Sequence, residues 1–166
     1  MFVGNYEVRM DAKHRVIVPQ KLREPRAEGG LVYSEFYLTL GAEGCIFVYT
    51  PEGWRKLMDE MGATKPLADA SLRTVQRLVA ANAVPCACDG QGRIVLPNDL
   101  RRHADLKRDV LWVGAVSRAE IWSVERWREY HETHAPLLSE SLDVVARAGF
   151  ALPGNPSHAA TPREET

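Results

Sequence analysis

The sequence has only three cysteines among its 166 residues, Cys45, Cys86 and Cys88, and neither their odd number nor their spacing suits a disulfide framework. It has no apolar run near the roughly 18 residues that a membrane helix needs. Residues 1–7 lack the basic start and apolar stretch of a secretory signal. These absences predict a cytoplasmic protein without a membrane segment.

Motifs of the common enzyme classes are also missing. There is no P-loop, no Gly-x-Ser-x-Gly and no Gly-x-Gly-x-x-Gly. The pair Cys86 and Cys88 lacks the second pair that zinc sites usually have, and His131 and His134 are three apart rather than the four of His-Glu-x-x-His. We therefore expect buried cysteines and surface histidines, no enzyme activity, no cofactor and no small-molecule substrate; stoichiometric zinc would instead favour a metalloenzyme.

Charge is balanced overall but unevenly distributed along the chain. The formal net charge is −1, yet residues 9–26 carry +4 and residues 89–108 carry +2, so the rest carries −7. Two basic segments can form one basic face for nucleic acid, although charges of this kind also occur on any solvated surface.

Those two segments contain an internal repeat. Residues 11–19, DAKHRVIVP, match residues 89–97, DGQGRIVLP, at an offset of 78. Downstream, residues 48–54 match residues 121–127 at an offset of 73, in the same order. Two ordered matches predict a tandem duplication.

Each copy is predicted to fold as a hairpin, a short helix after a proline, two further strands and a capped helix. Asp11 and Asp89 are predicted to hold the hairpin turns through backbone amides. The strands expected in the first copy are 6–10, 16–18, 31–40 and 45–49, with helices at 20–24 and after Pro51; in the second they are 84–88, 93–96, 110–116 and 120–122, with helices after Pro97 and Ser123. Further helices are expected at 67–81 and 137–148.

The predicted division of the chain is repeat 1 at 5–52, a helical connector at 53–82, repeat 2 at 83–126, C-terminal helices at 127–150 and a disordered tail at 151–166.

The two signatures resemble those of the MraZ family. The first is MFxGxY followed by DxKHRVxVP, the second is DxQGRIxLP, and the resemblance covers residues 1 to about 148. It implies an α+β, mainly β protein with two AbrB-like (SpoVT-AbrB-type) repeats as swapped-hairpin, double-ψ-type units, assembled into a closed homo-oligomeric ring. It also implies a transcription regulator, usually a repressor, of the division and cell wall gene cluster that includes its own promoter. Such a regulator binds short repeats in double-stranded promoter DNA and associates with the nucleoid.

By position, the resemblance places Lys13, Arg15 and Arg93 on the DNA-contacting surface. We expect each hairpin turn to project its arginine away from the sheet, where the guanidinium fork can contact phosphate or guanine. The other candidate DNA-binding residues are His14, Lys21, Arg23 and Gln91. For Arg23, as for Arg101, a helix-surface cation is an equally good interpretation.

The first turn departs from the family pattern. His14 stands where the family usually has glycine, and histidine adopts positive φ only with some strain. The turn is therefore reshaped or gains a phosphate contact. Because Lys13 is matched by Gln91, the first turn is the more cationic and should contribute more to affinity.

The rival interpretation is an AbrB-like protein-interaction or antitoxin-type module without specific DNA binding. Salt separates the two, because DNA affinity falls by about 0.9 log units per log unit of salt for each phosphate contact. Two short turns give one chain few contacts, so we expect a ring to gain avidity on repeated DNA boxes.

Overall fold

The computed structural model describes residues 1–23, 32–63 and 69–147. Residues 1–127 form one compact unit, and a second begins at Arg128, so each is described by itself. The tail expected at 151–166 and the helix ends expected at Pro25 and Gly149 lie outside the described residues.

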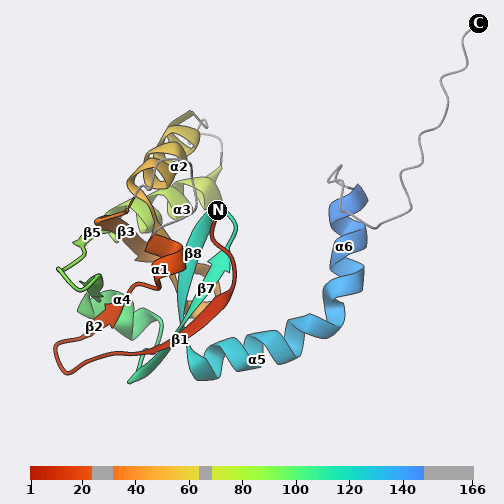
Figure 1. Ribbon diagram of the computed structural model, residues 1–166. Helices are drawn as coiled ribbons and strands as arrows, with labels where there is room; N and C mark the ends of the chain where they lie inside the picture. Colours follow the sequence, from red (N-terminus) through yellow and green to blue (C-terminus); the bar gives the residue numbers. More distant parts are fainter. Residues whose placement is uncertain (24–31, 64–68, 148–166) are drawn as a thin grey trace, which may run out of the picture. The chain divides into compact units, whose positions relative to one another are not determined.

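The elements of both copies follow the predicted order (Figure 1). The predicted hairpins do not form, however, because the strands on either side of each turn, at 5–9 and 15–17 and at 84–87 and 93–95, pair with strands of the other copy instead of with each other. The first copy consists of β1 (Asn5–Arg9), β2 (Arg15–Ile17), α1 (Gln20–Arg23), β3 (Glu35–Leu40), a 3-10 turn η1 (Ala42–Gly44), β4 (Ile46–Tyr49) and α2 (Pro51–Ala63). After α3 (Ala70–Ala81), the second consists of β5 (Val84–Ala87), β6 (Arg93–Val95), α4 (Asn98–His103), β7 (Asp109–Ala115), β8 (Arg118–Ser123) and α5 (Val124–His134).

Side-chain caps start three of these helices. Thr50 Oγ1 accepts a hydrogen bond from the Gly53 N–H at 3.1 Å, and Ser123 Oγ accepts one from the Arg126 N–H at 3.1 Å, as the sequence predicts. Asp69 caps α3, which begins at Ala70, while the start expected at residue 67 lies outside the described residues. Strand β3 is also shorter than expected, because residues 32–34 form no strand.

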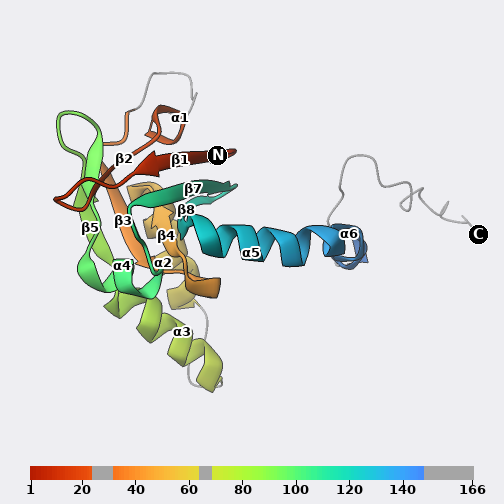
Figure 2. The same ribbon diagram turned by 90° about the horizontal axis from the view of Figure 1, so that it is seen from below.

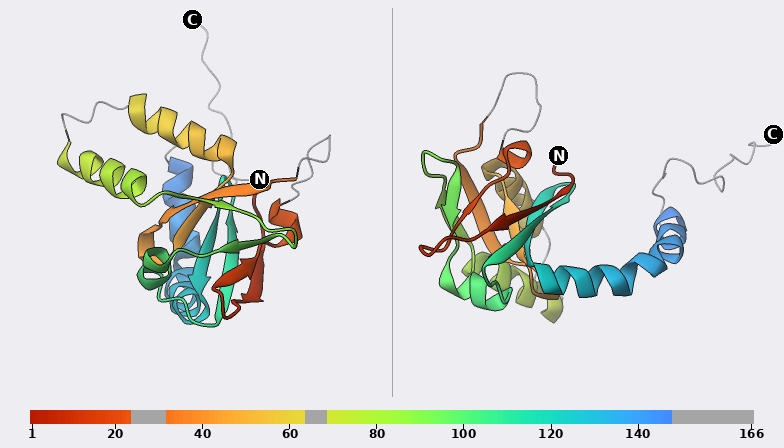
Figure 3. Two further views of the ribbon diagram at one scale, coloured as in Figure 1. Left: turned by 90° about the vertical axis from the view of Figure 1, so that its left-hand side faces the viewer. Right: turned by 60° about the horizontal axis from the view of Figure 1, so that its bottom comes forward.

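The two copies share one sheet. Its six strands run in the order β1-β7-β8-β4-β3-β5, and β2 pairs with β6 in a separate two-stranded ribbon. When each strand is replaced by its counterpart in the other copy, the same strand order is obtained in reverse. The two copies are therefore related by a pseudo-two-fold axis. Each copy lends an edge strand to the other, since β1 pairs with β7 and β5 pairs with β3. The two copies are thus intertwined, as the resemblance to swapped-hairpin repeats implies, and β1 and β5 form the two edges of the sheet (Figure 3).

The core lies between the ribbon and the sheet. Val16 and Ile94 face each other across the centre of the ribbon and are completely buried. They join sheet residues such as Phe36, Ile46 and Trp112 in one apolar cluster. Burial of one side of the ribbon fixes its register, because a slip of one residue would turn the other side inward.

Helices α2 and α3 pack at the opposite end of this unit from α1, β1 and β2 (Figure 2). Thr39 in β3 donates a hydrogen bond to the Val79 carbonyl of α3, and the Gln76 side chain donates to the Met61 carbonyl of α2. Neither α2 nor α3 therefore covers the ribbon side of this unit.

The second unit holds the rest of α5, a 3-10 turn η2 (Ala135–Leu137) and α6 (Leu138–Arg147). Apolar side chains of α6 are exposed, with Leu138 at 60 %. Among the helices in the described ranges, none combines the length and the apolar character needed to cross a bilayer.

Candidate nucleic-acid interface

The β2–β6 ribbon presents a short face away from the core. The register pairs Arg15 with Val95 and Ile17 with Arg93 across the two strands. Side chains alternate along a strand, so these four lie opposite the buried Val16 and Ile94. Ile17 and Val95 are 40 % and 55 % exposed, which is unusual for such apolar side chains.

A turn precedes each ribbon strand, and an aspartate organises it. Asp11 Oδ1 accepts hydrogen bonds from the Lys13 and Arg15 N–H groups at 2.9 and 3.0 Å. Asp89 Oδ1 accepts the equivalent bonds in the second turn, at 2.9 and 3.0 Å. The predicted structural role of both aspartates is therefore confirmed.

The residue directly before each ribbon strand has a left-handed backbone. Gly92 has φ 74° and His14 has φ 59°, so the histidine adopts the conformation that favours glycine. At Gly92 a Cβ would also overlap the guanidinium of Arg23, which packs onto this turn from α1 of the other copy. His14 itself is exposed.

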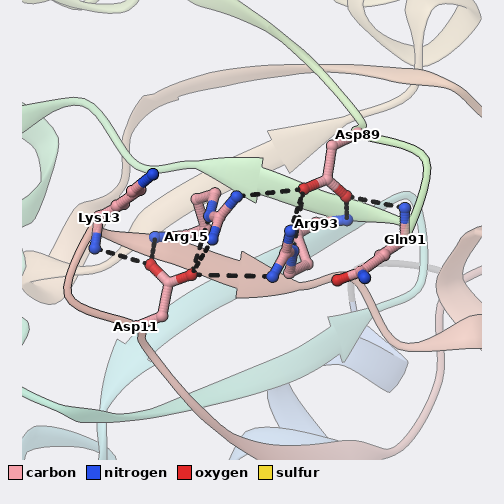
Figure 4. Close-up of polar contacts among 6 residues, drawn as sticks. All are labelled: Asp11, Lys13, Arg15, Asp89, Gln91 and Arg93. Atoms are coloured by element: carbon pink, nitrogen blue, oxygen red, sulfur yellow. Dashed lines mark hydrogen bonds and ion pairs between the residues drawn. The ribbon is translucent and has the colours of Figure 1, made fainter.

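The two arginines join both aspartates in one ion-pair cluster (Figure 4). Arg15 Nη2 lies 2.7 Å from Asp11 Oδ2, and Arg93 Nη2 lies 2.7 Å from Asp89 Oδ2. Longer contacts cross between the copies, from Arg15 Nη1 to Asp89 Oδ2 at 3.8 Å and from Arg93 Nη1 to Asp11 Oδ2 at 3.9 Å.

This cluster corrects one expectation. The arginines do not project away from the sheet, because the carboxylates hold their side chains along the ribbon, with 27 % and 26 % of each exposed. Two guanidinium groups and two carboxylates also carry no net charge together. The net positive charge near the turns must therefore come from other residues.

The aspartates stay ionised far into acid. The backbone and side-chain hydrogen bonds from Arg15 lower the pKa of Asp11 to about 2. The side-chain and backbone hydrogen bonds from Arg93 likewise lower the pKa of Asp89 to about 2. A hydrogen bond to the charged form favours that form, so the cluster remains intact over the neutral pH range.

The remaining candidate residues surround this cluster. Lys13, Gln91 and Lys21 are exposed, the first two at the tips of the turns and the third on α1. Arg23 is half-buried against Gly92. Sequence reasoning missed Ile17 and Val95, although strict alternation around the buried Val16 and Val18 was the signal that could have identified an outward Ile17.

Two of the three cysteines are buried, and the two histidines of α5 are exposed, as expected. Burial raises the pKa of the Cys86 thiol to about 11, and Cys88 is half-buried. His131 and His134 are exposed on α5. Within the described ranges, no group of three or more histidine, cysteine, aspartate or glutamate side chains is placed to hold a metal ion.

Related proteins agree with the repeat. The profile of the family described as "MraZ protein, putative antitoxin-like" matches twice, over residues 1–78 and 79–144. A protein named transcriptional regulator MraZ from Heliobacterium modesticaldum is 42 % identical over 140 residues, covering 84 % of this chain and 93 % of the relative. Proteins of the same name from a Thermoanaerobacter species and from Clostridium beijerinckii are 43 % and 38 % identical, over 78 % and 81 % of this chain and 86 % and 89 % of theirs.

Proposed function

This chain belongs to the MraZ family, and from that premise we propose that it is a DNA-binding transcriptional regulator rather than an enzyme. The relatives at about 40 % identity carry the name of a transcriptional regulator over most of both chains. We place the DNA contact on the β2–β6 ribbon and its two turns.

The outward face of the ribbon is the observation that carries this assignment. A two-stranded β-ribbon fits the major groove, where arginine reads guanine and apolar side chains contact the thymine methyl group. The ribbon presents both kinds of side chain, Arg15 and Arg93 beside Ile17 and Val95. The aspartates fix the arginines before DNA arrives, which reduces the conformational entropy that binding costs.

Phosphate contacts would come from the turns around this face. Lys13 and His14 are exposed at the first turn, and Lys21 lies nearby in sequence on α1. Gln91 at the second turn can donate a hydrogen bond without adding charge. Because Arg23 packs on Gly92, its guanidinium supports the second turn and lies close to the same surface.

The finer regulatory assignment rests on the family. We propose that the protein represses the division and cell wall gene cluster, including its own promoter. We also propose that it lies in the cytoplasm and associates with the nucleoid. Short repeated boxes in that promoter would suit a protein whose recognition unit is itself repeated.

We further propose that the AbrB-like units assemble into a closed ring. Exposed apolar side chains offer contact surfaces, such as Val75 and Leu78 on α3 and Leu138 on α6. A ring would present several ribbons to several DNA boxes, and linked sites raise avidity by about 10²–10⁴. Light scattering of the purified protein measures the number of chains, and a monomer at micromolar concentration would contradict the ring.

Binding to DNA from upstream of the protein's own gene tests the function. We expect preference over an unrelated duplex of equal length and an affinity that falls steeply with salt. In cells, deletion of the gene should raise expression from its own promoter. Equal binding to both duplexes at every salt concentration would favour the protein-interaction alternative.

A further inference from the structure

A cationic pocket lies beside the first turn, outside the ribbon face. Its volume is about 810 Å³. Four of its nine lining residues are arginine or lysine. The lining comes from β1, the first turn, α4 and the loop before β7: Arg9, Met10, Asp11, Ala12, His14, Arg101, Leu106, Lys107 and Arg108. Asp11 is the one acidic residue in that lining, and Arg15 already occupies its carboxylate.

The loop that carries Lys107 and Arg108 is held in place at both ends. At the end of α4, the Leu106 N–H donates to the Arg101 carbonyl and the Asp105 N–H to the Arg102 carbonyl, with Asp105 at φ 48°. This is the Schellman pattern of helix termination. At the other end, the Met10 N–H donates to the Arg108 carbonyl at 2.7 Å, which places this loop of the second copy directly beside the first turn.

Some of the cations that line the pocket already form hydrogen bonds or ion pairs, and others do not. Arg9 pairs with Asp109 at 3.0 Å, and Arg101 donates to the Leu96 carbonyl and to Asn98 Oδ1. Lys107 and Arg108 are exposed, and within the described part of the chain their side chains form no hydrogen bond or ion pair. They therefore add net positive charge that the ribbon cluster lacks.

The second turn is not flanked by a matching set of cations in the sequence. At the offset of 78, Ala87 corresponds to Arg9, and Gly92 to His14. The hydrogen bond from the Cys88 N–H to the Ser34 carbonyl is equivalent to the one from Met10 to Arg108, so Tyr33 and Ser34 stand in the first copy where the second has Lys107 and Arg108. The pseudo-symmetric ribbon is thus flanked by an extra group of cations beside the first turn.

We propose that this pocket is a phosphate-binding site for the DNA backbone, with Lys107 and Arg108 of the second repeat and His14 of the first as its donors. The inference rests on the proposed function and extends it, since DNA would contact both repeats at the first turn. Lysine and arginine contacts to phosphate position a protein on DNA without reading sequence. The site therefore adds affinity equally on any duplex.

The double variant Lys107→Gln with Arg108→Gln tests the site. We expect the slope of log affinity against log salt to become shallower by about 0.9 for each phosphate that the variant no longer binds, so by about 1.8 for two. Affinity for the upstream DNA and for an unrelated duplex should fall by the same factor. The matched control is Arg55→Gln with Lys56→Gln, an exposed adjacent pair on α2, and it should leave the slope unchanged.

Circular dichroism and light scattering establish that the variants fold and assemble as the wild type does. Should the double variant fail that check, Lys107→Gln alone is expected to change the slope by about 0.9. A wild-type slope in folded Lys107 variants, or an equal change in the control pair, would overturn the phosphate site while leaving the proposed function standing. Wild-type protein that binds no DNA would overturn both.

Discussion

The guanidinium of Arg15 in the first turn lies 3.8 Å from the carboxylate of Asp89 in the second turn. The reciprocal contact joins Arg93 to Asp11 at 3.9 Å. Each copy therefore holds its own arginine closely and the other copy's arginine more loosely. This arrangement joins the two turns in one ion-paired unit in which the two arginines are held at a fixed spacing.

Acid should loosen this unit. Because the pKa values of Asp11 and Asp89 are lowered to about 2 in the folded protein, while an unfolded aspartate has a pKa of about 4, their contribution to stability is present above pH 4. It disappears as the pH falls from about 4 toward 2. Unfolding by denaturant across this range measures the decrease.

The variant Asp89→Asn isolates one of the two carboxylates. It removes one titrating group, so its free energy of unfolding should depend less steeply on pH between about 4 and 2 than that of the wild type. The matched change Asp59→Asn, on the exposed side of α2, should keep the wild-type dependence. Identical slopes for Asp89→Asn and the wild type would show that the cluster does not stabilise the fold.

Replacing His14 with glycine should raise stability and weaken DNA binding. A non-glycine residue at φ 59° costs about 1–2 kcal/mol, and the greater freedom of unfolded glycine offsets about 0.5–1 kcal/mol of that gain. The net gain in the free energy of unfolding is therefore at most about 1.5 kcal/mol. If His14 donates to phosphate, DNA affinity falls in the same variant, and unchanged affinity would remove it from the contact surface.

Ile17→Thr and Val95→Thr should alter base preference without altering the salt dependence. Each change keeps a β-branched side chain but introduces a hydroxyl in place of apolar surface. Val95→Thr replaces one methyl group with a hydroxyl, which costs roughly 0.8 kcal/mol, or about fourfold in preference for the upstream DNA. Ile17→Thr replaces an ethyl group, so its effect should be larger. Stability should change by less than about 0.5 kcal/mol because both positions face outward.

The control for this pair is Val3→Thr, before the start of β1, where the side chain is 58 % exposed. It should leave DNA preference unchanged. If Ile17→Thr and Val95→Thr keep the full preference of the wild type, the apolar part of the ribbon does not read sequence.

Much of the fold could be predicted because its signals are local. The repeated Asp11 and Asp89 mark the turns, and Thr50 and Ser123 mark helix starts by side-chain chemistry that acts within three residues. The resemblance to swapped-hairpin repeats implied an exchange of strands between units, although the partner of each strand could not be read from local patterns.

The rest depends on contacts between distant segments. The orientation of Arg15 follows partly from Asp89, which is 74 positions away, and so the sequence alone favoured an arginine that projects outward. The pocket depends on the backbone bond between Met10 and Arg108. No periodicity in either segment indicates that they meet.

The most direct test of the ribbon as the DNA-reading element compares Arg15→Ala with Arg55→Ala on upstream and unrelated DNA. Both remove one arginine side chain, and Arg55 is exposed on α2. A third variant, Arg15→Lys, keeps the charge but lacks the planar fork. Only variants that fold and assemble like the wild type are compared.

The account predicts that Arg15→Ala loses the preference for upstream DNA, that Arg15→Lys keeps part of the affinity but little preference, and that Arg55→Ala behaves as the wild type. Full preference in a folded, assembled Arg15→Ala protein would contradict the account, because the ribbon would then not be the surface that reads DNA.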